Sequence, residues 1–375
     1  MSTTTRIVLA LAAVVLLIIL AFLFLRGDDG GAAQSPGATE AVSPSLAVSA
    51  TASAAASAAA ELQVAMIIAQ GGLGDQSYND LANTGLMEGE QELGIEAQRI
   101  ESPDIVSQGE AVLRQAGDAG FDVVVDLEFS TADALVAVAA EFPDTQWTFM
   151  NLPLEGDNIT SFVFAEHQGG YLAGALSALA TADTSIPGMN EELVIGAVGG
   201  TKSTGIDKFI VGFMQGAQET NPDVEVLVSY TNDFGDATKG QQAAEAMFEQ
   251  GADIVYQIAG GAGLGVIQAA EDAGKWAIGV DTDQSYLSPD AVLTSMVKRT
   301  DLAVMQSVQR GAEGTLGGEV VSLDLAAGGV ELGPINDAVP VDYVDQVDQL
   351  RQQIIDGEIE VWDVIEQGYP DYFSE

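Results

Sequence analysis

From Leu62 onward, short runs of β-branched and aromatic residues alternate with longer amphipathic runs. The short runs are typical of buried strands, and the longer ones place apolar residues at helical spacing. This alternation predicts parallel sheets with right-handed helical crossovers. The predicted strands cover 64–68, 95–100, 123–125, 147–150, 194–198, 224–229, 254–258 and 278–280. The predicted helices cover 81–93, 107–120, 132–140, 207–219, 237–250 and 263–273.

The alternation falls into two successive series, separated around residues 166–190. We therefore predict an α/β fold with two doubly wound lobes. The expected boundaries are 62–165 for the first lobe, completed by part of 299–340, then 166–298 for the second lobe and 341–375 for a tail packed on both. Ligands of such sheets bind outside the carboxyl ends of the strands, and in two lobes these ends face each other across a cleft.

The N-terminus carries an uncharged apolar run over residues 7–25, long enough to span a bilayer as a helix. No small-residue cleavage site follows at once, which favours an uncleaved membrane anchor over residues 1–26 rather than a signal peptide. Arg6 on the cytoplasmic side would place the body outside the cell, although Arg26 weakens that signal. Residues 27–61, rich in Ala, Ser and Gly, read as a tether.

The charge balance is extreme, with 56 acidic against 12 basic residues and a net charge of −44. Such a surface repels polyanions, so we expect no nucleic-acid partner. The acidity could serve solubility or adaptation to high salt, and both readings stay open. The absence of cysteine excludes disulfides, thiolate metal sites, thiol nucleophiles and a lipid-modified cysteine anchor.

Glycine, acidic, amide and aromatic residues gather directly after the predicted strands, where a ligand would bind. Glycines there would let a ligand approach the backbone, and Tyr78 and Phe234 could stack on a planar group. Other interpretations stand beside these, since Asp75, Ser77 and Asp236 could cap the following helices and the two aromatics could pack under loops.

Catalysis and cofactors have little support. The chain has one histidine, His167, expected on a surface or hinge helix, and no G-x-S-x-G serine elbow. The glycines of 260–265 lack the dinucleotide spacing and position. Asp133, Asp281 and Asp283 could pair or hold a divalent cation, but their spacing is not that of a calcium loop. We predict no enzyme activity, no cofactor and no metal.

Several of these segments, taken in order, resemble the basic membrane protein family of ABC-transporter substrate-binding proteins, which includes purine nucleoside receptors. The resemblance runs from about Val64 to about Val361. The matching segments are Gly71-Gly72-x-x-Asp75-x-Ser77-Tyr78-Asn79; Glu166 to Gly174; Gly199-Gly200 with Phe209 to Gly212-Phe213 and Gly216-Ala217; Tyr230 with Phe234 and Asp236; Gly251-Ala252-Asp253 to Gly260 and Gly263; Gly279-Val280-Asp281-x-Asp283-Gln284; Leu293 to Lys298; and Ile355 to Ile359.

The resemblance implies a type I periplasmic-binding-protein fold whose lobes close on a nucleoside-like ligand by hinge motion. It implies that Tyr78 and Phe234 sandwich the base, that Asp281 and Lys298 hold ribose hydroxyls, and that Gly260 offers backbone nearby. Asp133 is expected to supply the acidic group of the first lobe, with Asp126 as its rival. The candidate ligand-binding residues are Gln70, Asp75, Tyr78, Asn79, Asp126, Asp133, Phe234, Gly260, Asp281, Asp283 and Lys298.

The chain departs from the family pattern in three places. Ala69 and Gln70 stand where an acidic residue often contacts the base, Asp126 replaces a glycine, and a helix replaces the lipid anchor. An amide both donates and accepts, so this departure is compatible with a purine, with a different base or with another ligand. We therefore predict an extracytoplasmic solute-binding protein that passes a nucleoside, most often a purine, to an ABC permease. Alternatives are a sensory module, a receptor for a sugar or other polar solute, or a nucleoside hydrolase.

Overall fold

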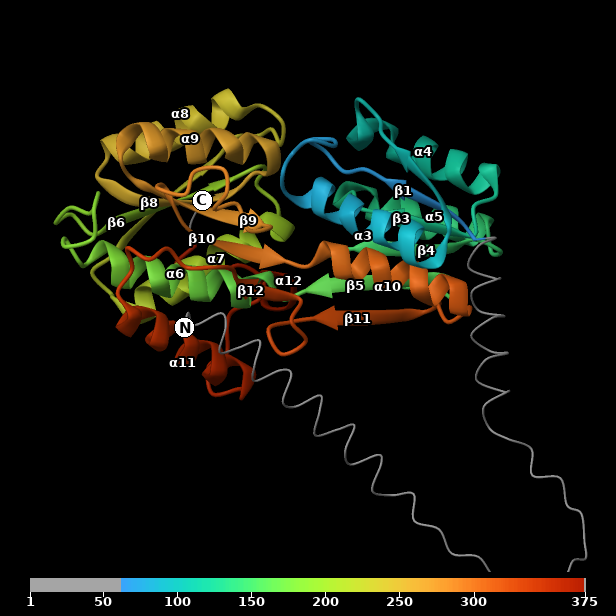
Figure 1. The fold of residues 1–375 in the computed structure, drawn as a ribbon. Helices are drawn as coiled ribbons and strands as arrows, with labels where there is room; N and C mark the ends of the chain where they lie inside the picture. Colours follow the sequence, from blue (N-terminus) through green and yellow to red (C-terminus); the bar gives the residue numbers. More distant parts are fainter. Residues whose placement is uncertain (1–61, 374–375) are drawn as a thin grey trace, which may run out of the picture. The chain divides into compact units, whose positions relative to one another are not determined.

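Two six-stranded sheets organise residues 62–373, the part of the chain that the computed structural model describes (Figure 1). The first sheet has the order β11-β5-β4-β3-β1-β2 and is parallel throughout. The second has the order β12-β10-β9-β8-β6-β7 and is parallel except for β12, which runs antiparallel to β10. The prediction of an α/β fold with two parallel-sheet lobes is confirmed.

The strands and helices have the following bounds. The first sheet contains β1 (Gln63–Ile67), β2 (Glu96–Ile100), β3 (Val123–Asp126), β4 (Gln146–Met150), β5 (Ile159–Phe164) and β11 (Glu319–Leu323). The second contains β6 (Val194–Gly199), β7 (Glu225–Tyr230), β8 (Ala252–Ile258), β9 (Trp276–Asp281), β10 (Val292–Lys298) and β12 (Val330–Leu332). The helices are α3 (Tyr78–Leu93), α4 (Ile105–Ala119), α5 (Ala132–Glu141), α6 (Glu166–Thr181), α7 (Thr204–Thr220), α8 (Ala237–Glu249), α9 (Gly263–Ala273), α10 (Thr300–Glu313), α11 (Val341–Ile355) and α12 (Val364–Gln367).

Helices cover both faces of each sheet, which is why the central strands read as unbroken apolar runs. In β1, Val64 and Met66 pack with α3 and α10, whereas Ala65 and Ile67 pack with α4 and α5. The second sheet repeats this pattern, with α6 and α7 on one face and α8 and α9 on the other (Figure 1). Both lobes are therefore three-layered, and the carboxyl ends of their strands are free to hold a ligand.

The chain passes between the lobes three times. The passages are β5 to α6 around Ala165, β10 to α10 around Arg299, and β11 to β12 through residues 324–329. The third passage is bonded to the other two, since the Ala165 amide donates to Leu323 O at 3.1 Å and the Arg299 amide donates to Gly329 O at 2.9 Å. The three connections thus form one hydrogen-bonded group at one side of the lobes.

The predicted strands and helices coincide with observed ones to within a few residues, but some elements were missed. β5, β10, β11 and β12 are absent from the predicted strands, and α10, α11 and α12 are absent from the predicted helices. Helix α3 begins at Tyr78 rather than at Leu81, because the Asp75 carboxylate accepts the amide hydrogens of Ser77, Asn79 and Asp80.

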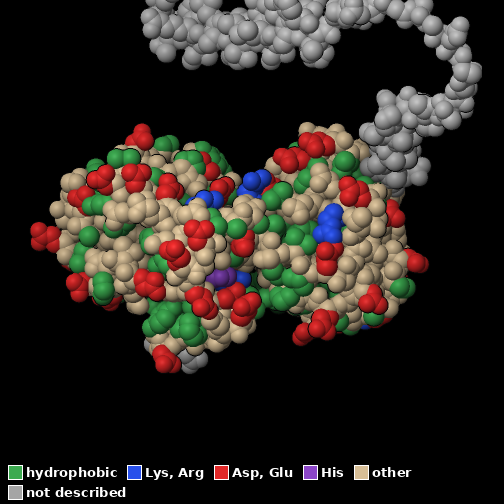
Figure 2. All heavy atoms as spheres, turned by 90° about the horizontal axis from the view of Figure 1, so that it is seen from below, with side chains coloured by type: hydrophobic (Ala, Val, Ile, Leu, Met, Phe, Trp, Pro, Cys, Tyr) green, Lys and Arg blue, Asp and Glu red, His purple; other side chains and the backbone are tan. Residues whose placement is uncertain are grey.

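The predicted anchor and tether, residues 1–61, lie outside the described residues. Within residues 62–373, none of the helices combines the length and the apolar character that crossing a bilayer requires. One face of the molecule is shown in Figure 2, where acidic side chains are scattered over both lobes and basic ones are few.

Candidate functional site

A cavity lies between the two lobes at the carboxyl ends of their strands, and the space between its atoms is about 680 Å³ when the open solvent at its mouth is included. Its walls come from the first turns after β1, β3 and β4, from the start of α7, and from the ends of β8, β9 and β10. Eight of the predicted site residues line it: Gln70, Asp75, Tyr78, Asn79, Phe234, Gly260, Asp281 and Lys298.

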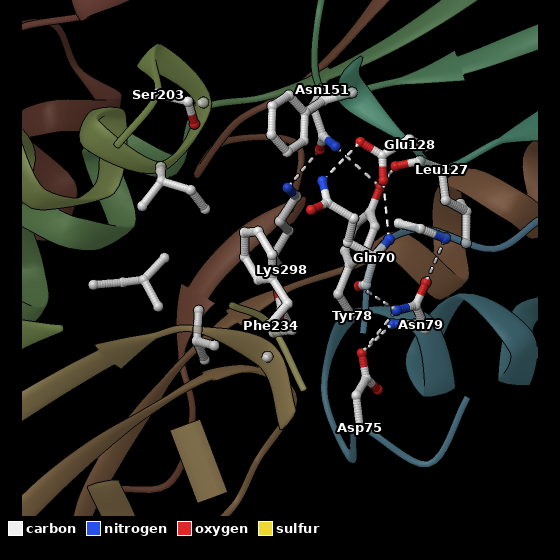
Figure 3. Close-up of a pocket in the computed structure, with 18 of the residues that line it drawn as sticks. Gln70, Asp75, Tyr78, Asn79, Leu127, Glu128, Asn151, Ser203, Phe234 and Lys298 are labelled. Carbon is white, nitrogen blue, oxygen red and sulfur yellow. Dashed lines mark hydrogen bonds between the residues drawn. The ribbon is translucent and has the colours of Figure 1, made fainter. Parts of the chain in front are cut away.

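Two aromatic walls come from opposite lobes. Tyr78 opens α3 in the first lobe, where its hydroxyl donates to Leu127 O at 3.1 Å and accepts from Asn151 Nδ2 at 3.0 Å. Phe234 follows β7 in the second lobe, and its ring lies over Gly200 and Gly260. A Cβ atom at Gly200 would overlap that ring, so glycine is required there to place Phe234 against the cavity (Figure 3).

Lys298 ends β10 and carries its charge into the cavity wall. Its Nζ lies 2.9 Å from Glu166 Oε1 and donates to Asn151 Oδ1 at 2.5 Å. Three aromatic rings also surround it, since Nζ is 5.1 Å from the centroid of Tyr78, 4.9 Å from that of Phe164 and 5.4 Å from that of Phe209. An ammonium group has three protons, and Glu166 and Asn151 account for two of them.

Asp281 ends β9 with a backbone φ of +66°, a conformation that a non-glycine residue adopts only when its surroundings impose it. Its Oδ2 accepts from Ser77 Oγ of the other lobe at 2.6 Å. Burial raises the pKa of Asp281 to about 6, although Lys298 and the Ser77 hydroxyl both lower it. Within residues 62–373 the Oδ1 atom of Asp281 accepts no hydrogen bond, so this oxygen is available to a ligand.

Other lining residues serve the protein rather than a ligand. Both oxygens of Asp75 accept from the start of α3, as one of the alternative interpretations predicted. Asn79 accepts from the Ala69 amide at 2.9 Å and donates to Gln70 O at 3.3 Å, which fixes the loop after β1. Asp236, outside the cavity, caps α8 by accepting from the Thr238 amide.

Three candidate carboxylates lie outside the cavity. Asp133 is exposed on the first turn of α5, and Asp283 accepts from the Ser285 amide in the turn after β9. Asp126 is fully buried beneath the turn that follows β3. Glu128, two residues beyond Asp126 in the chain, does line the cavity.

Asp126 has a strongly raised pKa. Thr131 Oγ1 lies 2.5 Å from Asp126 Oδ2 and 2.6 Å from Glu128 O, and its single proton is shared between these two acceptors. Burial raises the pKa of Asp126 to about 7, against the opposing hydrogen bonds that Thr131 and the Glu128 amide donate to it.

This raised pKa predicts a pH-dependent stability. Because the folded state holds the proton more tightly than the unfolded state, the contribution of Asp126 is present at low pH and is lost as the pH rises toward about 7. Between pH 5 and pH 8 the free energy of unfolding of the wild type should fall by about 2–3 kcal/mol relative to Asp126→Asn. Urea denaturation at both pH values measures this, with Asp118→Asn on the exposed side of α4 as control. If the difference in unfolding free energy between the wild type and Asp126→Asn were the same at both pH values, the raised pKa of Asp126 would be contradicted.

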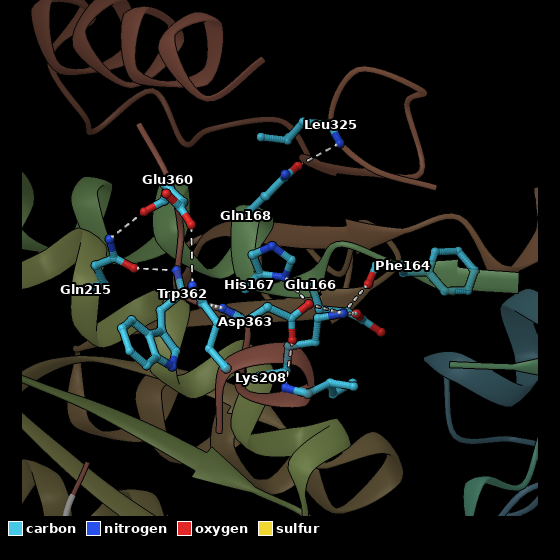
Figure 4. Close-up of polar contacts among 12 residues, drawn as sticks. Phe164, Glu166, His167, Gln168, Lys208, Gln215, Leu325, Glu360, Trp362 and Asp363 are labelled. Carbon is cyan, nitrogen blue, oxygen red and sulfur yellow. Dashed lines mark hydrogen bonds and ion pairs between the residues drawn. The ribbon is translucent and has the colours of Figure 1, made fainter. Parts of the chain in front are cut away.

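A chain of buried charges connects the cavity to the C-terminal segment (Figure 4). Glu166, the first residue of α6, lies between Lys298 at 2.9 Å and Lys208 at 3.3 Å. Lys208 donates to Phe164 O at 2.7 Å and lies 3.2 Å from Asp363 at the start of α12. Burial would raise the pKa of Glu166, but Lys298 and Lys208 together hold it below its ordinary value. The carboxylate is therefore ionised and joins two lysines.

His167 belongs to the same region and is neutral. It follows the first passage between the lobes, on α6, and its side chain is buried. Burial and the nearby Lys208 lower the pKa of His167 to about 4, so its 3.5 Å contact with Asp363 is not an ion pair at pH 7. Within residues 62–373 no group of three or more His, Cys, Asp or Glu residues is placed to hold a metal ion.

The lobes are in direct contact across the cleft. In addition to the bond between Ser77 and Asp281, Gln284 Nε2 donates to Gln76 O at 2.9 Å, and the Tyr286 hydroxyl donates to Gln76 Oε1 at 3.1 Å. All three contacts join the loop that precedes α3 to the loop that follows β9. The structure is therefore a closed arrangement of the two lobes around the cavity.

Several lining residues were missed by sequence reasoning. Asn151 was detectable, because it follows the predicted strand 147–150 as the other candidates follow theirs, and its φ of +82° marks the same kind of constrained strand end. Ser203 also follows a strand, and its buried Oγ has no hydrogen-bond partner within residues 62–373. Phe209 lies inside a helix and gave no signal. The other missed lining residues are Ala69, Leu127, Glu128, Phe129, Gly205, Ile206, Ile258 and Val280.

Two three-layered α/β lobes, closed over a cavity with aromatic walls and free polar atoms, define a solute-binding protein of the periplasmic type. Residues 62–364 match the family model described as "ABC transporter substrate-binding protein PnrA-like". The chain belongs to this family, which is one of substrate-binding proteins and not of enzymes.

Similar proteins agree with this assignment. A CD4+ T-cell-stimulating antigen of Listeria monocytogenes is 30% identical over 323 residues, covering 80% of this chain and 88% of that protein. The ABC transporter nucleoside-binding protein BmpA of Lactococcus lactis is 32% identical over 327 residues, covering 80% and 89%. Among solved structures, an ABC transporter solute-binding protein of Aeropyrum pernix superposes with a TM-score of 0.73 at 27% identity, covering 80% and 93%.

Proposed function

We propose that this protein captures a nucleoside, with purines preferred, by closure of its two lobes outside the cytoplasmic membrane and delivers it to an ABC permease. The observation that carries the proposal is the cavity itself, which combines opposed aromatic side chains with acceptor and donor atoms from both lobes. In this proposal Tyr78 and Phe234 stack on a flat base, and Asp281 Oδ1 and the Lys298 ammonium hold the hydroxyls of a ribose. The similarity to a nucleoside-binding protein supports the same ligand class.

Closure follows from contacts that both lobes make to one ligand. Tyr78 and Gln70 belong to the first lobe, and Phe234, Asp281 and Lys298 belong to the second. A ligand held by both sets binds the closed state better than the open state, and this difference in affinity is what shifts the population. In this proposal the predicted N-terminal helix anchors the body at the membrane, where the permease also lies.

Calorimetric titration of residues 61–375 with a panel of purine and pyrimidine nucleosides tests the proposal. We expect saturable one-to-one binding of a purine nucleoside, and Asp281→Ala should weaken it by about 1.5–3 kcal/mol, because a hydrogen bond to a charged acceptor is lost. Asp283→Ala, two residues further along and outside the cavity, is the matched control. No binding of any nucleoside, in protein shown by mass spectrometry to hold no ligand, would remove the nucleoside assignment. Unchanged affinity of Asp281→Ala alone would reject only the role of that residue.

A further inference from the structure

Gln70 follows β1 and reaches into the cavity beside Tyr78 (Figure 3). Its backbone amide donates to Glu128 Oε2 at 2.9 Å, and its side-chain Nε2 donates to Glu128 Oε1 at 3.2 Å. Gln70 is thus held twice by one carboxylate. Both ends of this interaction belong to the first lobe, so it does not depend on closure.

Glu128 is itself fixed. Its side chain is fully buried, and Oε1 also accepts from the Ser130 amide at 3.0 Å. Three N–H groups therefore point at the two oxygens of this carboxylate, which as an acceptor cannot pair with another acceptor. The side-chain amide of Gln70 consequently meets Glu128 with its NH₂ group, and a flipped amide would place two oxygen atoms in contact.

The orientation of the amide decides what Gln70 offers to a ligand. With Nε2 directed at Glu128, Oε1 is directed toward the interior of the cavity and the second lobe, as Figure 3 shows. Within residues 62–373 this oxygen accepts no hydrogen bond. A ligand that fills the cavity must either donate a hydrogen bond to Oε1 or leave it unpaired, and an unpaired buried acceptor costs affinity.

We propose that Glu128 holds the Gln70 amide as a hydrogen-bond acceptor that reads an exocyclic amino group of a purine base, so that the site selects amino-bearing purine nucleosides. The inference rests on the proposed nucleoside function and adds a specificity rule to it. Gln70 is the residue that contacts the ligand, and Glu128 is a positioning residue that acts through Gln70.

Two pairs of nucleosides test the rule, because the members of each pair differ by one exocyclic amino group. These pairs are adenosine with purine riboside and guanosine with inosine. In calorimetric titrations of the wild type, at least one amino-bearing member should bind about tenfold or more tightly than its partner. In Gln70→Leu that ratio should approach one.

Glu128→Gln examines the positioning role separately. An amide at position 128 can pair with either orientation of Gln70, so Gln70 becomes free to turn its NH₂ group toward the cavity. The amino-bearing ligand should then lose its advantage, because an NH₂ group of Gln70 would meet the amino group of adenosine donor to donor, and purine riboside, which has no amino group there, should gain affinity relative to adenosine. Glu92→Gln, on the exposed side of α3, is the control and should keep the wild-type ratio.

The outcomes separate the specificity rule from the function. If purine nucleosides bind but neither pair differs in the wild type, the rule is wrong and nucleoside binding stands. A ratio that survives in Gln70→Leu assigns the selection to another residue and also overturns the rule. If no purine nucleoside binds, the proposed function itself fails. If Glu128→Gln melts well below the wild type, the affinity ratios of Gln70→Leu and of the Glu92→Gln control still test whether Gln70 selects the amino group.

Discussion

Gly174→Leu is expected to lower the free energy of unfolding by at least about 3 kcal/mol. Gly170 and Gly174 lie on the face of α6 that meets α7, where Gly212 and Gly216 lie opposite. At each of these glycines an added Cβ would overlap backbone of the facing helix; for Gly174 the overlap is with Phe213 O. A leucine at Gly174 must therefore push the two helices apart.

Thermal and urea unfolding measure this effect, with Gly205→Ala as the control. Gly205 lies in α7 as well, but a Cβ there would meet no other atom within 4 Å, and alanine is the better helix former. The control should thus melt at or above the wild-type temperature. Because Glu166 begins α6 and Phe209 lies in α7, the separated helices should also bind ligand poorly. A Gly174→Leu protein as stable as the wild type would show that this helix contact is not tight.

Glu166→Gln should cost about 3–5 kcal/mol of unfolding free energy at pH 7. Glu166 is 2% exposed and balances two buried lysines, so its removal leaves Lys298 and Lys208 with less compensation than their burial requires. Since the pKa of Glu166 lies below its ordinary value, its contribution is present above that ordinary value and is lost as the pH falls through the folded pKa. The difference between variant and wild type should accordingly shrink in acid.

Glu90→Gln provides the matched control, because Glu90 pairs with Arg99 at 2.8 Å in a partly exposed position. Surface pairs of this kind contribute about 0–1 kcal/mol. Urea denaturation of both variants at pH 7 compares them. If both variants lost the same unfolding free energy, Glu166 would not compensate the charges of the two buried lysines.

The parts of the site that sequence reasoning located share one property, which is that they lie at the end of a strand, in the loop that follows it or at the start of the next helix. Gln70, Phe234 and Asp281 come after apolar runs that are easily detected, and the topology of parallel sheets brings such positions together. The same reasoning could not decide which of several neighbouring carboxylates lines the cavity. Asp126, Glu128 and Asp133 lie within eight positions of one another, and the short 3-10 turn Phe129–Thr131 decides that Glu128 alone lines the cavity.

Two further features depended on tertiary structure. Phe209 lines the cavity from inside a helix, where the periodicity of the sequence predicts only burial. It reaches the cavity because the first turns of α7 form part of the cavity wall. The strands β11 and β12 become recognisable through their partners β5 and β10 rather than through their own residues. Lys208 gave no signal as a partner of Glu166, because the two are far apart in sequence and meet only when α6 packs on α7.

The three passages between the lobes limit how the molecule can open. A single connection would let one lobe swivel about any axis through it, but three connections bonded side by side behave as a strip that resists twisting. Rotation about the long direction of that strip disturbs the fewest of its hydrogen bonds, and it separates Gln76 from Gln284 and Tyr286. The proposed closure is thus a motion with essentially one degree of freedom. Ligands of similar size would therefore bring the molecule along the same path to nearly the same outer surface, which is the property that a single docking partner needs in order to recognise the loaded state.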